Sequence, residues 1–393
     1  MCKIDYNNLI FDYANQMFIP ADANYPIDSN INKERLKHCY RNNEISRNFN
    51  IGIPNIFIQS TYRCNARCKY CFEQSYMSDL YMSDEVALKT AKYIQQFAVN
   101  NSAYLTFFGG EPTVYTKPFD IITEYLDRNF IEYYSTMTTN GYLLDTFDIY
   151  KMIFKYHMVD IQISLDGDDP EYSIAKNYKN NDSHAVDKIL GNIENLFIKT
   201  TIHVLLRLNI NLTNSDSIYR FIDKLKLFNN KYHNKLSVYC TAINSAKGFT
   251  LTDEESKYLA EQEFELNKYL LYQNFNLHTT TNITPSAFAC TANNPFECMI
   301  TPNGNVVICS ESHDCSDVLS NVDSFGIENK EVRLKFATMA EYNLCKDCPR
   351  YIICSITNLC PSSNGCNSQF KERMLNRDKL FVLKNSLEFY NEH

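Results

Sequence analysis

The chain has 393 residues, enough for one large domain and a smaller one. Its formal net charge of −8 argues against a basic surface for nucleic acid. No apolar run approaches the roughly 20 residues of a membrane span, and the N-terminus lacks the apolar core of a signal peptide. We therefore expect a cytoplasmic protein with neither nucleic acid nor membrane as a partner. In that compartment its 15 cysteines are better explained as metal ligands than as disulfides.

Residues 1–50 are polar and weakly periodic, and we expect a short strand pair or helix in this N-terminal extension. From about residue 51 onward, apolar runs alternate with helical segments. The runs are Ile56–Ile58, Tyr104–Phe108, Tyr134–Thr138, Val159–Leu165, Thr201–Leu208 and Leu236–Ile243. Six strands that alternate with helices predict an α/β fold with a parallel sheet, so residues 51–245 are interpreted as six β/α units.

Two helix starts carry clear capping signals. Ser83 is a suitable N-cap because its hydroxyl can accept a hydrogen bond from the first turn. Thr252 and Glu255 form the pattern of a capping box, which predicts a helix from Asp253 to Tyr272. A further helix is expected after Asn214, where apolar residues recur at helical spacing.

The remaining boundaries follow from composition. We interpret residues 246–289 as a connector and residues 290–368 as a cysteine-rich domain, because nine of the cysteines lie in the last 104 residues. Residues 369–393 are amphipathic and are predicted to be a C-terminal helix.

Three cysteines, Cys64, Cys68 and Cys71, lie within eight residues in the spacing C-x3-C-x2-C, just after the first predicted strand. The carboxyl ends of parallel strands are where α/β folds place their chemistry. Three thiolates can hold three irons of a [4Fe–4S] cluster and leave the fourth iron open to a ligand. Zinc is the alternative, but structural zinc usually takes four ligands with C-x2-C pairs.

Polar or glycine-rich segments follow the next strands. The loop Gly109–Pro112 contains two glycines, which let backbone approach a ligand closely. Ser164 ends the fourth strand, and Arg207 lies in the otherwise apolar fifth strand. A buried Arg needs an anionic partner, either a structural carboxylate or a ligand. Arg207 and Ser164 could hold the carboxylate of a ligand on the open iron, while the glycine loop receives its amine.

The motifs resemble those of the radical S-adenosylmethionine (SAM) superfamily over about residues 52–245. The matching segments are Cys64–Cys71, Gly109–Pro112, Thr139–Gly141 and Ser164–Gly167. The resemblance implies a partial (β/α)6 barrel with a [4Fe–4S] cluster and SAM at its open end. It also implies that the reduced cluster passes one electron to SAM, and that the resulting 5′-deoxyadenosyl radical abstracts a substrate hydrogen. An electron donor such as flavodoxin or ferredoxin would then be a partner.

Residue by residue, the resemblance assigns Cys64, Cys68 and Cys71 as the cluster ligands. The positions that it assigns to the cofactor are Tyr70 near the adenine, Gly109, Gly110 and Glu111 in the loop that meets the methionyl amine, Asn140, and Ser164 and Arg207 at the ribose or carboxylate. It assigns no catalytic side chain.

The later cysteines resemble the SPASM extension of the same superfamily, which carries two auxiliary [4Fe–4S] clusters. By that resemblance the outer cluster takes Cys345, Cys348, Cys354 and Cys366, and the inner cluster takes Cys290, Cys309 and Cys360. The fourth inner ligand is Cys298, Cys315 or none. Five residues separate Cys354 from Cys360, where the family usually has three. A zinc ribbon is the alternative for these later cysteines, and electron relay and substrate ligation both remain open as roles.

SPASM proteins mostly modify peptides or proteins. We favour a maturase that forms a C–C or thioether crosslink in a ribosomally made peptide (a RiPP maturase). The alternative is an anaerobic sulfatase-maturing enzyme, which makes formylglycine. In that family an Asp follows the cysteine that closes the G-x4-C motif, whereas Ser310 follows Cys309 here. The 50 residues before the barrel are expected to be too short for a leader-binding winged helix.

A non-enzymatic iron–sulfur or zinc scaffold is a third possibility. The Gly109–Pro112 loop and Arg207 argue against it, because a scaffold needs no site for a cofactor. Cys2, Cys39 and Cys240 are expected to be plain thiols, since buried cysteines often pack as small apolar residues.

Overall fold

The computed structural model describes residues 3–6, 9–12, 17–20, 54–74, 76–233, 235–243, 250–278, 292, 294, 296–309, 317–324, 329–332, 348, 350 and 368–391. Of the cysteines predicted as auxiliary-cluster ligands, six lie outside these residues: Cys290, Cys315, Cys345, Cys354, Cys360 and Cys366. Near the N-terminus, three strands form a separate antiparallel sheet in the order β1 (Lys3–Tyr6), β2 (Leu9–Asp12) and β3 (Met17–Pro20).

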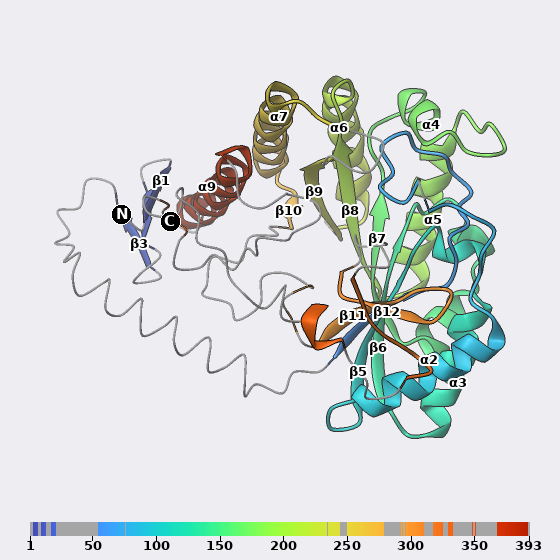
Figure 1. Cartoon of the computed structure of the whole chain (residues 1–393). Coiled ribbons are helices and arrows are strands. Elements are labelled where there is room, and N and C mark those ends of the chain that lie inside the picture. The colour runs from blue at the N-terminus through green and yellow to red at the C-terminus, as the bar shows by residue number, and fades with distance from the viewer. Residues whose placement is uncertain are drawn as a thin grey trace, which may run out of the picture.

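The six predicted strands are confirmed, and they pair in parallel in chain order (Figure 1). They are β4 (Asn55–Gln59), β5 (Ser102–Phe108), β6 (Glu132–Thr139), β7 (Met158–Ser164), β8 (His203–Ile210) and β9 (Leu236–Ala242). Parallel strands require crossover connections, which the helices between them supply. All six carboxyl ends therefore meet at one edge of the sheet.

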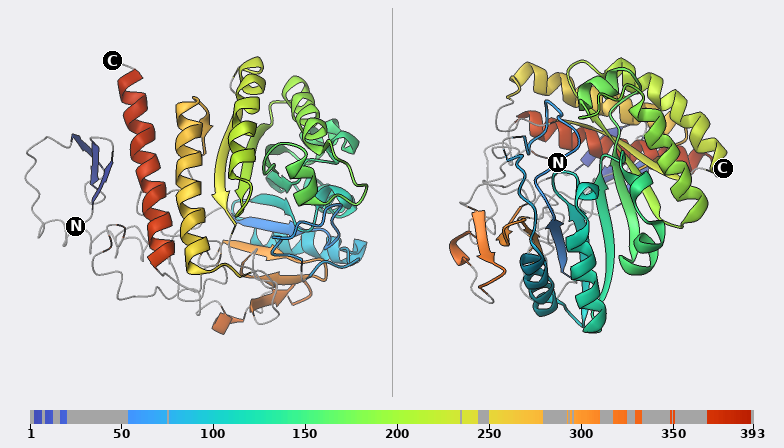
Figure 2. Two further views of the ribbon diagram at one scale, coloured as in Figure 1. Left: turned by 90° about the horizontal axis from the view of Figure 1, so that it is seen from above. Right: turned by 90° about the vertical axis from the view of Figure 1, so that its right-hand side faces the viewer.

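The helices of the crossovers bury one face of the sheet (Figures 1 and 2). They are α2 (Asp84–Phe97), α3 (Lys117–Arg128), α4 (Glu171–Lys176), α5 (Ala185–Lys199) and α6 (Ser215–Lys231), with short turns η1 (Pro112–Val114), η2 (Leu144–Thr146) and η3 (Lys151–Lys155). The Ser83 hydroxyl caps α2 by accepting a hydrogen bond from the Val86 amide at 3.2 Å, as predicted. Within the described part of the chain, no helix has the length and apolar character needed to cross a membrane.

The two faces of the sheet differ in chemistry because successive side chains on a strand point to opposite sides. Ile56, Leu105 and Ile161 are fully buried in the core. The other face carries polar side chains in hydrogen-bonded pairs. Thr106 donates to the Asn55 side chain at 3.1 Å, and further polar pairs continue across β6 to β9. This polar face lines the inside of the partial barrel.

Four further strands from residues beyond 245 join the sheet. Strand β10 (Asn276–Leu277) extends it in parallel beside β9, and β11 (Glu297–Ile300) pairs in parallel with β4, followed by antiparallel β12 (Asn305–Val307) and β13 (Val318–Asn321). Figure 2 shows β11 beside β4 although they are far apart in sequence. The sequence analysis predicted no strands in these later residues. An uncovered β4 would expose a row of unpaired backbone groups, which β11 satisfies.

The C-terminal helix predicted for residues 369–393 is confirmed as α9 (Ser368–Asn391). It lies beside α7 (Asp253–Tyr272), which begins at the predicted capping box (Figure 2). Arg373 and Arg377 of α9 bind the buried carboxylate of Glu263 on α7 at 2.7 and 2.8 Å. Arg373 also donates to the carbonyl of Ala242 at 3.0 Å, so α9 is fixed to the carboxyl end of β9.

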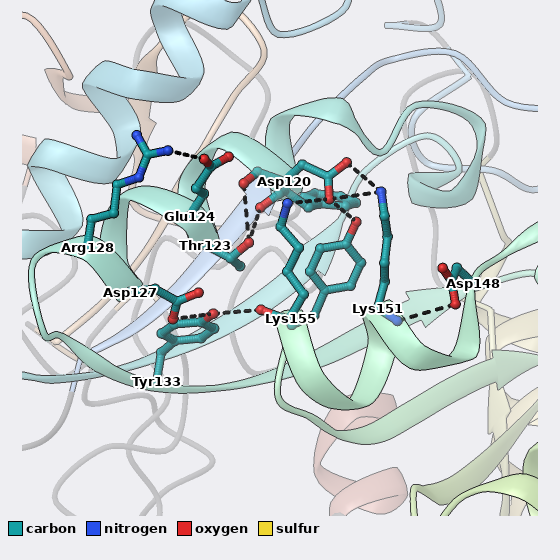
Figure 3. Close-up of polar contacts among 11 residues, drawn as sticks. Asp120, Thr123, Glu124, Asp127, Arg128, Tyr133, Asp148, Lys151 and Lys155 are labelled. Carbon is teal, nitrogen blue, oxygen red and sulfur yellow. Dashed lines mark hydrogen bonds and ion pairs between the residues drawn. The ribbon is translucent and has the colours of Figure 1, made fainter.

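On the outer surface, Asp120 of α3 ties that helix to η3 (Figure 3). Its carboxylate lies 3.0 Å from the Lys151 ammonium and 3.1 Å from that of Lys155. The Tyr156 hydroxyl donates to it at 2.9 Å. Burial raises the pKa of Asp120, but these hydrogen bonds outweigh burial and lower the pKa below its ordinary value.

Candidate functional site

The cysteine loop leaves the carboxyl end of β4 and folds back over it. Cys64 is buried, while Cys68 and Cys71 are partly buried. The Ala66 amide donates to the Cys64 sulfur at 3.4 Å, and the Cys71 amide donates to the Cys68 carbonyl at 3.2 Å. The structure thus places all three predicted cluster ligands at the edge where the parallel strands end.

The three thiols lie where a bare thiolate is disfavoured. Burial, with a smaller effect of nearby Glu111, raises the pKa of Cys64 to about 12. Burial and nearby Glu73 raise the pKa of Cys71 to about 12, and burial also raises that of Cys68. A positive metal centre reverses this preference because thiolates are its ligands. The donor set therefore fits a metal centre.

The number of donors is the feature that separates the two candidate centres. A structural zinc site usually takes four ligands, and the cysteine loop offers three thiols in the spacing C-x3-C-x2-C. Three thiolates are enough to hold a [4Fe–4S] cluster that keeps one iron open to a ligand.

The glycine loop after β5 lies against the base of the cysteine loop. Gly109 has φ of +91° and Gly110 has φ of +32°. A Cβ on Gly109 would lie 1.9 Å from Cγ of Gln59, and one on Gly110 would lie 2.3 Å from the Arg63 carbonyl oxygen. Only glycine permits these approaches, so the pair is required for packing against β4 and the start of the cysteine loop.

Glu111 is fully buried and uses both carboxylate oxygens within the protein. One oxygen accepts from the Thr113 amide at 3.1 Å and from the hydroxyls of Thr113 and Thr139 at 2.6 Å each. The other accepts from the Asn140 amide at 2.8 Å. Burial raises the pKa of Glu111 and these hydrogen bonds oppose that rise. Glu111 thus cross-links the loops that follow β5 and β6.

Asn140 connects this pair of loops to the cysteine loop. Its side-chain amide donates to the side-chain oxygen of Asn65 at 2.7 Å. Asn65 stands between Cys64 and Cys68 in the sequence. The Asn140 side-chain oxygen accepts from the Tyr142 amide at 3.0 Å. Predicted residues from three successive strand ends are therefore assembled into one hydrogen-bonded unit.

Ser164 and Arg207 lie opposite each other on the parallel strands β7 and β8. The Arg207 Nε donates to the Asn209 side-chain oxygen at 2.9 Å. No carboxylate in the described ranges forms an ion pair with the Arg207 guanidinium, so the structural salt bridge considered as an alternative is not found there. Arg207 remains available to an anionic ligand from within the barrel.

The hydroxyl of Tyr70 donates to the Asp166 carboxylate, and Asp166 forms an ion pair with Lys176 at 2.9 Å. Asp166 also accepts from the Asn209 amide at 3.1 Å, which links it to the end of β8. The sequence did not indicate Lys176. A lysine at the end of a short helix is ordinarily solvent-exposed, and only the tertiary fold shows that this one is buried.

Three buried polar atoms without a hydrogen-bond partner lie between the end of β4 and the start of the cysteine loop. They are Gln59 Oε1, Ser60 Oγ and Asn65 Nδ2, among the described residues. Buried polar groups are normally satisfied, so unpaired ones indicate where a ligand belongs. Asn65 was missed as a site residue, although its position between two predicted ligands could have identified it.

Of the predicted auxiliary ligands, the structure describes Cys298, Cys309 and Cys348. Cys298 lies on β11 and Cys309 follows β12, and both are buried. Because Met299 pairs with Val307, the two cysteines lie toward the same end of this hairpin. Cys348 is partly buried.

Comparisons with known proteins agree with this arrangement. Residues 58–221 match the family model of the Radical SAM superfamily. A candidate glycyl-radical enzyme activating enzyme of Methanocaldococcus jannaschii is 30% identical over 105 residues. That match covers 27% of this chain, and the chain spans only 37% of the length of this curated relative.

Two sets of solved structures share the fold. Native anSMEcpe, a sulfatase-maturing enzyme solved with AdoMet and the Kp18Cys peptide, has a TM-score of 0.64 and 18% identity over 85% of this chain and 100% of its own. Streptococcus suis SuiB bound to S-adenosylmethionine has a TM-score of 0.57 and 13% identity over 88% of this chain and 91% of its own. SuiB has also been solved with its precursor peptide SuiA. At these identities the likeness shows the fold alone.

Proposed function

We propose that this chain, which carries a radical SAM domain over residues 58–221, is an enzyme that cleaves S-adenosylmethionine at a [4Fe–4S] cluster held by Cys64, Cys68 and Cys71. The observation that carries the proposal is the set of three thiols, one buried and two partly buried, in the loop that follows the carboxyl end of β4. When bound, the cluster and SAM would supply homolytic S–C bond cleavage and radical hydrogen abstraction. The protein holds the reactants in place and excludes water.

The proposed cofactor site lies between the glycine loop and β8. Arg207, with Ser164 on the neighbouring strand, would bind the SAM carboxylate, since a guanidinium matches a carboxylate in both charge and geometry. The backbone of Gly109 and Gly110 would face the methionyl amine. Tyr70 would lie near the adenine, with its ring held by the hydrogen bond to Asp166. Glu111 and Asn140 would act mainly by fixing the loops.

We propose a peptide or protein as the substrate. The polar inner face of the sheet supports this, because hydroxyl and amide side chains there can hydrogen-bond to an extended backbone. Both anSMEcpe and SuiB, which share this fold, have been solved with a bound peptide. Within this class we favour a maturase that crosslinks a ribosomal peptide, because Ser310 stands where the sulfatase-maturing enzymes have an Asp. Formylglycine formation is the second candidate.

The later cysteines would hold two auxiliary [4Fe–4S] clusters in a SPASM domain. The structure describes three of these cysteines, of which Cys298 and Cys309 are buried and Cys348 is partly buried. An electron donor such as flavodoxin or ferredoxin would deliver the electron for each SAM cleavage.

The first experiment tests SAM cleavage. Protein reconstituted anaerobically with iron and sulfide is mixed with SAM and dithionite, and released 5′-deoxyadenosine is measured. We expect release from the wild type and from Cys240→Ala, a buried cysteine outside the loop, but none from Cys64→Ala, Cys68→Ala or Cys71→Ala. Equal release from the loop variants would refute the assignment of these ligands.

The second experiment tests the substrate. Candidate precursor peptides encoded beside this gene are co-expressed with it and analysed by mass spectrometry. Loss of two hydrogens from the peptide indicates a crosslink, whereas exchange of a cysteine thiol for an aldehyde oxygen indicates formylglycine. The second result would replace the first candidate by the alternative.

A further inference from the structure

A buried ion pair lies directly beneath the cysteine loop. The Lys176 ammonium is 2.9 Å from the Asp166 carboxylate, and the two side chains are only 5% and 2% exposed. Lys176 ends helix α4, and Asp166 follows strand β7. Removing two charges from water carries a large cost, so such a pair needs close compensation.

Aromatic side chains shield the pair from solvent. The ammonium lies 5.6 Å from the ring centroid of Tyr70 and 5.6 Å from that of Tyr172. The Tyr70 hydroxyl donates to Asp166, and the hydroxyls of Tyr172 and Tyr178 hydrogen-bond at 2.9 Å. A charge enclosed in this way is poorly screened by water and acts over a longer range than a surface charge.

The backbone around Lys176 is also bound to the cysteine loop. The Arg67 amide donates to the Lys176 carbonyl at 2.9 Å, and the Cys68 sulfur lies 3.9 Å from the same oxygen. The Lys179 amide donates to the Asn65 carbonyl at 2.9 Å. These contacts hold the backbone of Lys176 against the cysteine loop.

The position of the ammonium places its charge close to the cysteine loop. It lies 5.6 Å from the ring of Tyr70, which stands between Cys68 and Cys71 in the sequence. The carbonyl of the same lysine is 3.9 Å from the Cys68 sulfur. A positive charge at this distance in a buried site stabilises negative charge on a group held by the loop.

Stability alone does not account for the pair. Replacing a buried ion pair by apolar side chains of similar volume is often neutral or stabilising. An apolar residue at position 176 would leave the backbone contacts to Arg67 and Cys68 intact. The charge itself therefore requires a separate explanation.

We propose that Lys176 is a positioning residue that fixes a positive charge beside Cys68 and Cys71 and thereby raises the reduction potential of the cluster. The inference rests on the proposed function, since it requires a cluster on the loop. Each reduction adds one electron from an external low-potential donor to the cluster. A fixed positive charge nearby stabilises the added negative charge.

The test is a redox titration of reconstituted protein, with the reduced cluster followed by electron paramagnetic resonance. The auxiliary cysteines are left intact, and the loop cluster is identified as the signal that SAM perturbs. Lys176→Met should lower the ratio of reduced to oxidised cluster about tenfold at a given potential, which is a shift of 59 mV to more negative potential. Lys176→Arg keeps the charge and should keep the wild-type potential.

Two further variants test the direction in which the reduction potential shifts. Asp166→Asn leaves the ammonium without its counter-charge and should shift the potential in the positive direction. The double variant Lys176→Met/Asp166→Asn should return to near the wild-type value. Lys224→Met is the matched control, because Lys224 pairs with Asp168 of the same β7–α4 segment at 2.9 Å, and its ion pairs in the described part of the chain are with Asp168 and Asp187.

The outcomes separate the two proposals. A wild type without any SAM-sensitive iron–sulfur signal refutes both. A wild type with this signal, and a Lys176→Met variant with full iron content and an unchanged potential, refutes only the role of Lys176. If Lys176→Met fails to bind iron, Asp166→Asn decides, and an unchanged or more negative potential there overturns the inference.

Discussion

The carboxylate of Glu111 accepts a hydrogen bond from the backbone amide of Asn140 at 2.8 Å and thereby joins the loops after β5 and β6. Both residues belong to motifs that the sequence assigned to the cofactor. In the structure the four hydrogen bonds to Glu111 come from the protein itself. The residue thus shapes the site by holding Thr139 and Asn140 in place.

Glu111→Ala should destabilise the fold and weaken SAM binding together. Removing the carboxylate leaves several buried donors unpaired, each at a cost of about 1–3 kcal/mol. We expect a loss of about 3 kcal/mol in urea unfolding of the iron-free protein and a raised KM for SAM. Glu124→Ala, which removes an exposed partner of Arg128, should change stability by less than about 1 kcal/mol. Equal effects of the two variants would contradict the role given to Glu111.

Gly110→Ala tests the packing of the glycine loop. Its added Cβ would meet the Arg63 carbonyl oxygen at 2.3 Å, and its φ of +32° is unfavourable for alanine. We expect destabilisation by about 2 kcal/mol or more, with reduced iron incorporation. The control is Gly191→Ala in α5, where nothing lies within 4 Å and alanine should stabilise the helix by about 1 kcal/mol. A Gly110→Ala protein as stable as the wild type would show that the loop packs differently.

Glu263→Gln tests the attachment of α9. The substitution leaves Arg373 and Arg377 without the carboxylate that they share, and breaking a buried ion pair costs about 3–5 kcal/mol. Thermal and urea unfolding should therefore shift clearly to lower stability. The exposed neighbour Glu265, paired with Lys268 at 3.3 Å, supplies the control as Glu265→Gln, for which little change is expected. If the two variants unfold alike, α9 does not depend on this contact.

The contacts of Asp120 predict a loss of stability in acid. Ion pairs with Lys151 and Lys155 and a hydrogen bond from Tyr156 lower the pKa of Asp120 in the folded state. These interactions therefore stabilise the fold at pH values above the unfolded-state pKa of about 3.9. This stabilisation is lost as the pH falls from there through the lowered folded-state value. Unfolding free energy measured against pH should therefore fall less steeply in this range for Asp120→Asn. Parallel curves for the two proteins would contradict the assignment.

The sequence predicted the central architecture because its signals are local. Alternating apolar runs located all six parallel strands, and the caps at Ser83 and Thr252 located two helix starts to the residue. The three cysteines lie at the expected strand end because a parallel sheet brings all carboxyl ends to one edge. Their roles as ligands, and those of the cofactor residues, stay predictions.

What the sequence did not indicate depends on contacts between distant segments. Strand β11 is short, and only its pairing with β4 shows that the cysteine-rich region extends the barrel sheet. Lys176 looks like an ordinary surface lysine until Asp166, from a different element, is placed 2.9 Å away. Glu111 belongs to a motif that suggests contact with a ligand. In the structure its carboxylate instead accepts hydrogen bonds from Thr139 and Asn140 and joins two loops of the protein.

The central claim is that Cys64, Cys68 and Cys71 hold a cluster with one iron open to SAM. The most direct measurement is the electron paramagnetic resonance spectrum of the dithionite-reduced, anaerobically reconstituted protein, recorded with and without SAM. We predict a reduced iron–sulfur signal that changes when SAM is added, and no such change in Cys71→Ala. Zinc in place of iron, or an iron–sulfur signal that SAM leaves unaltered, would contradict the account.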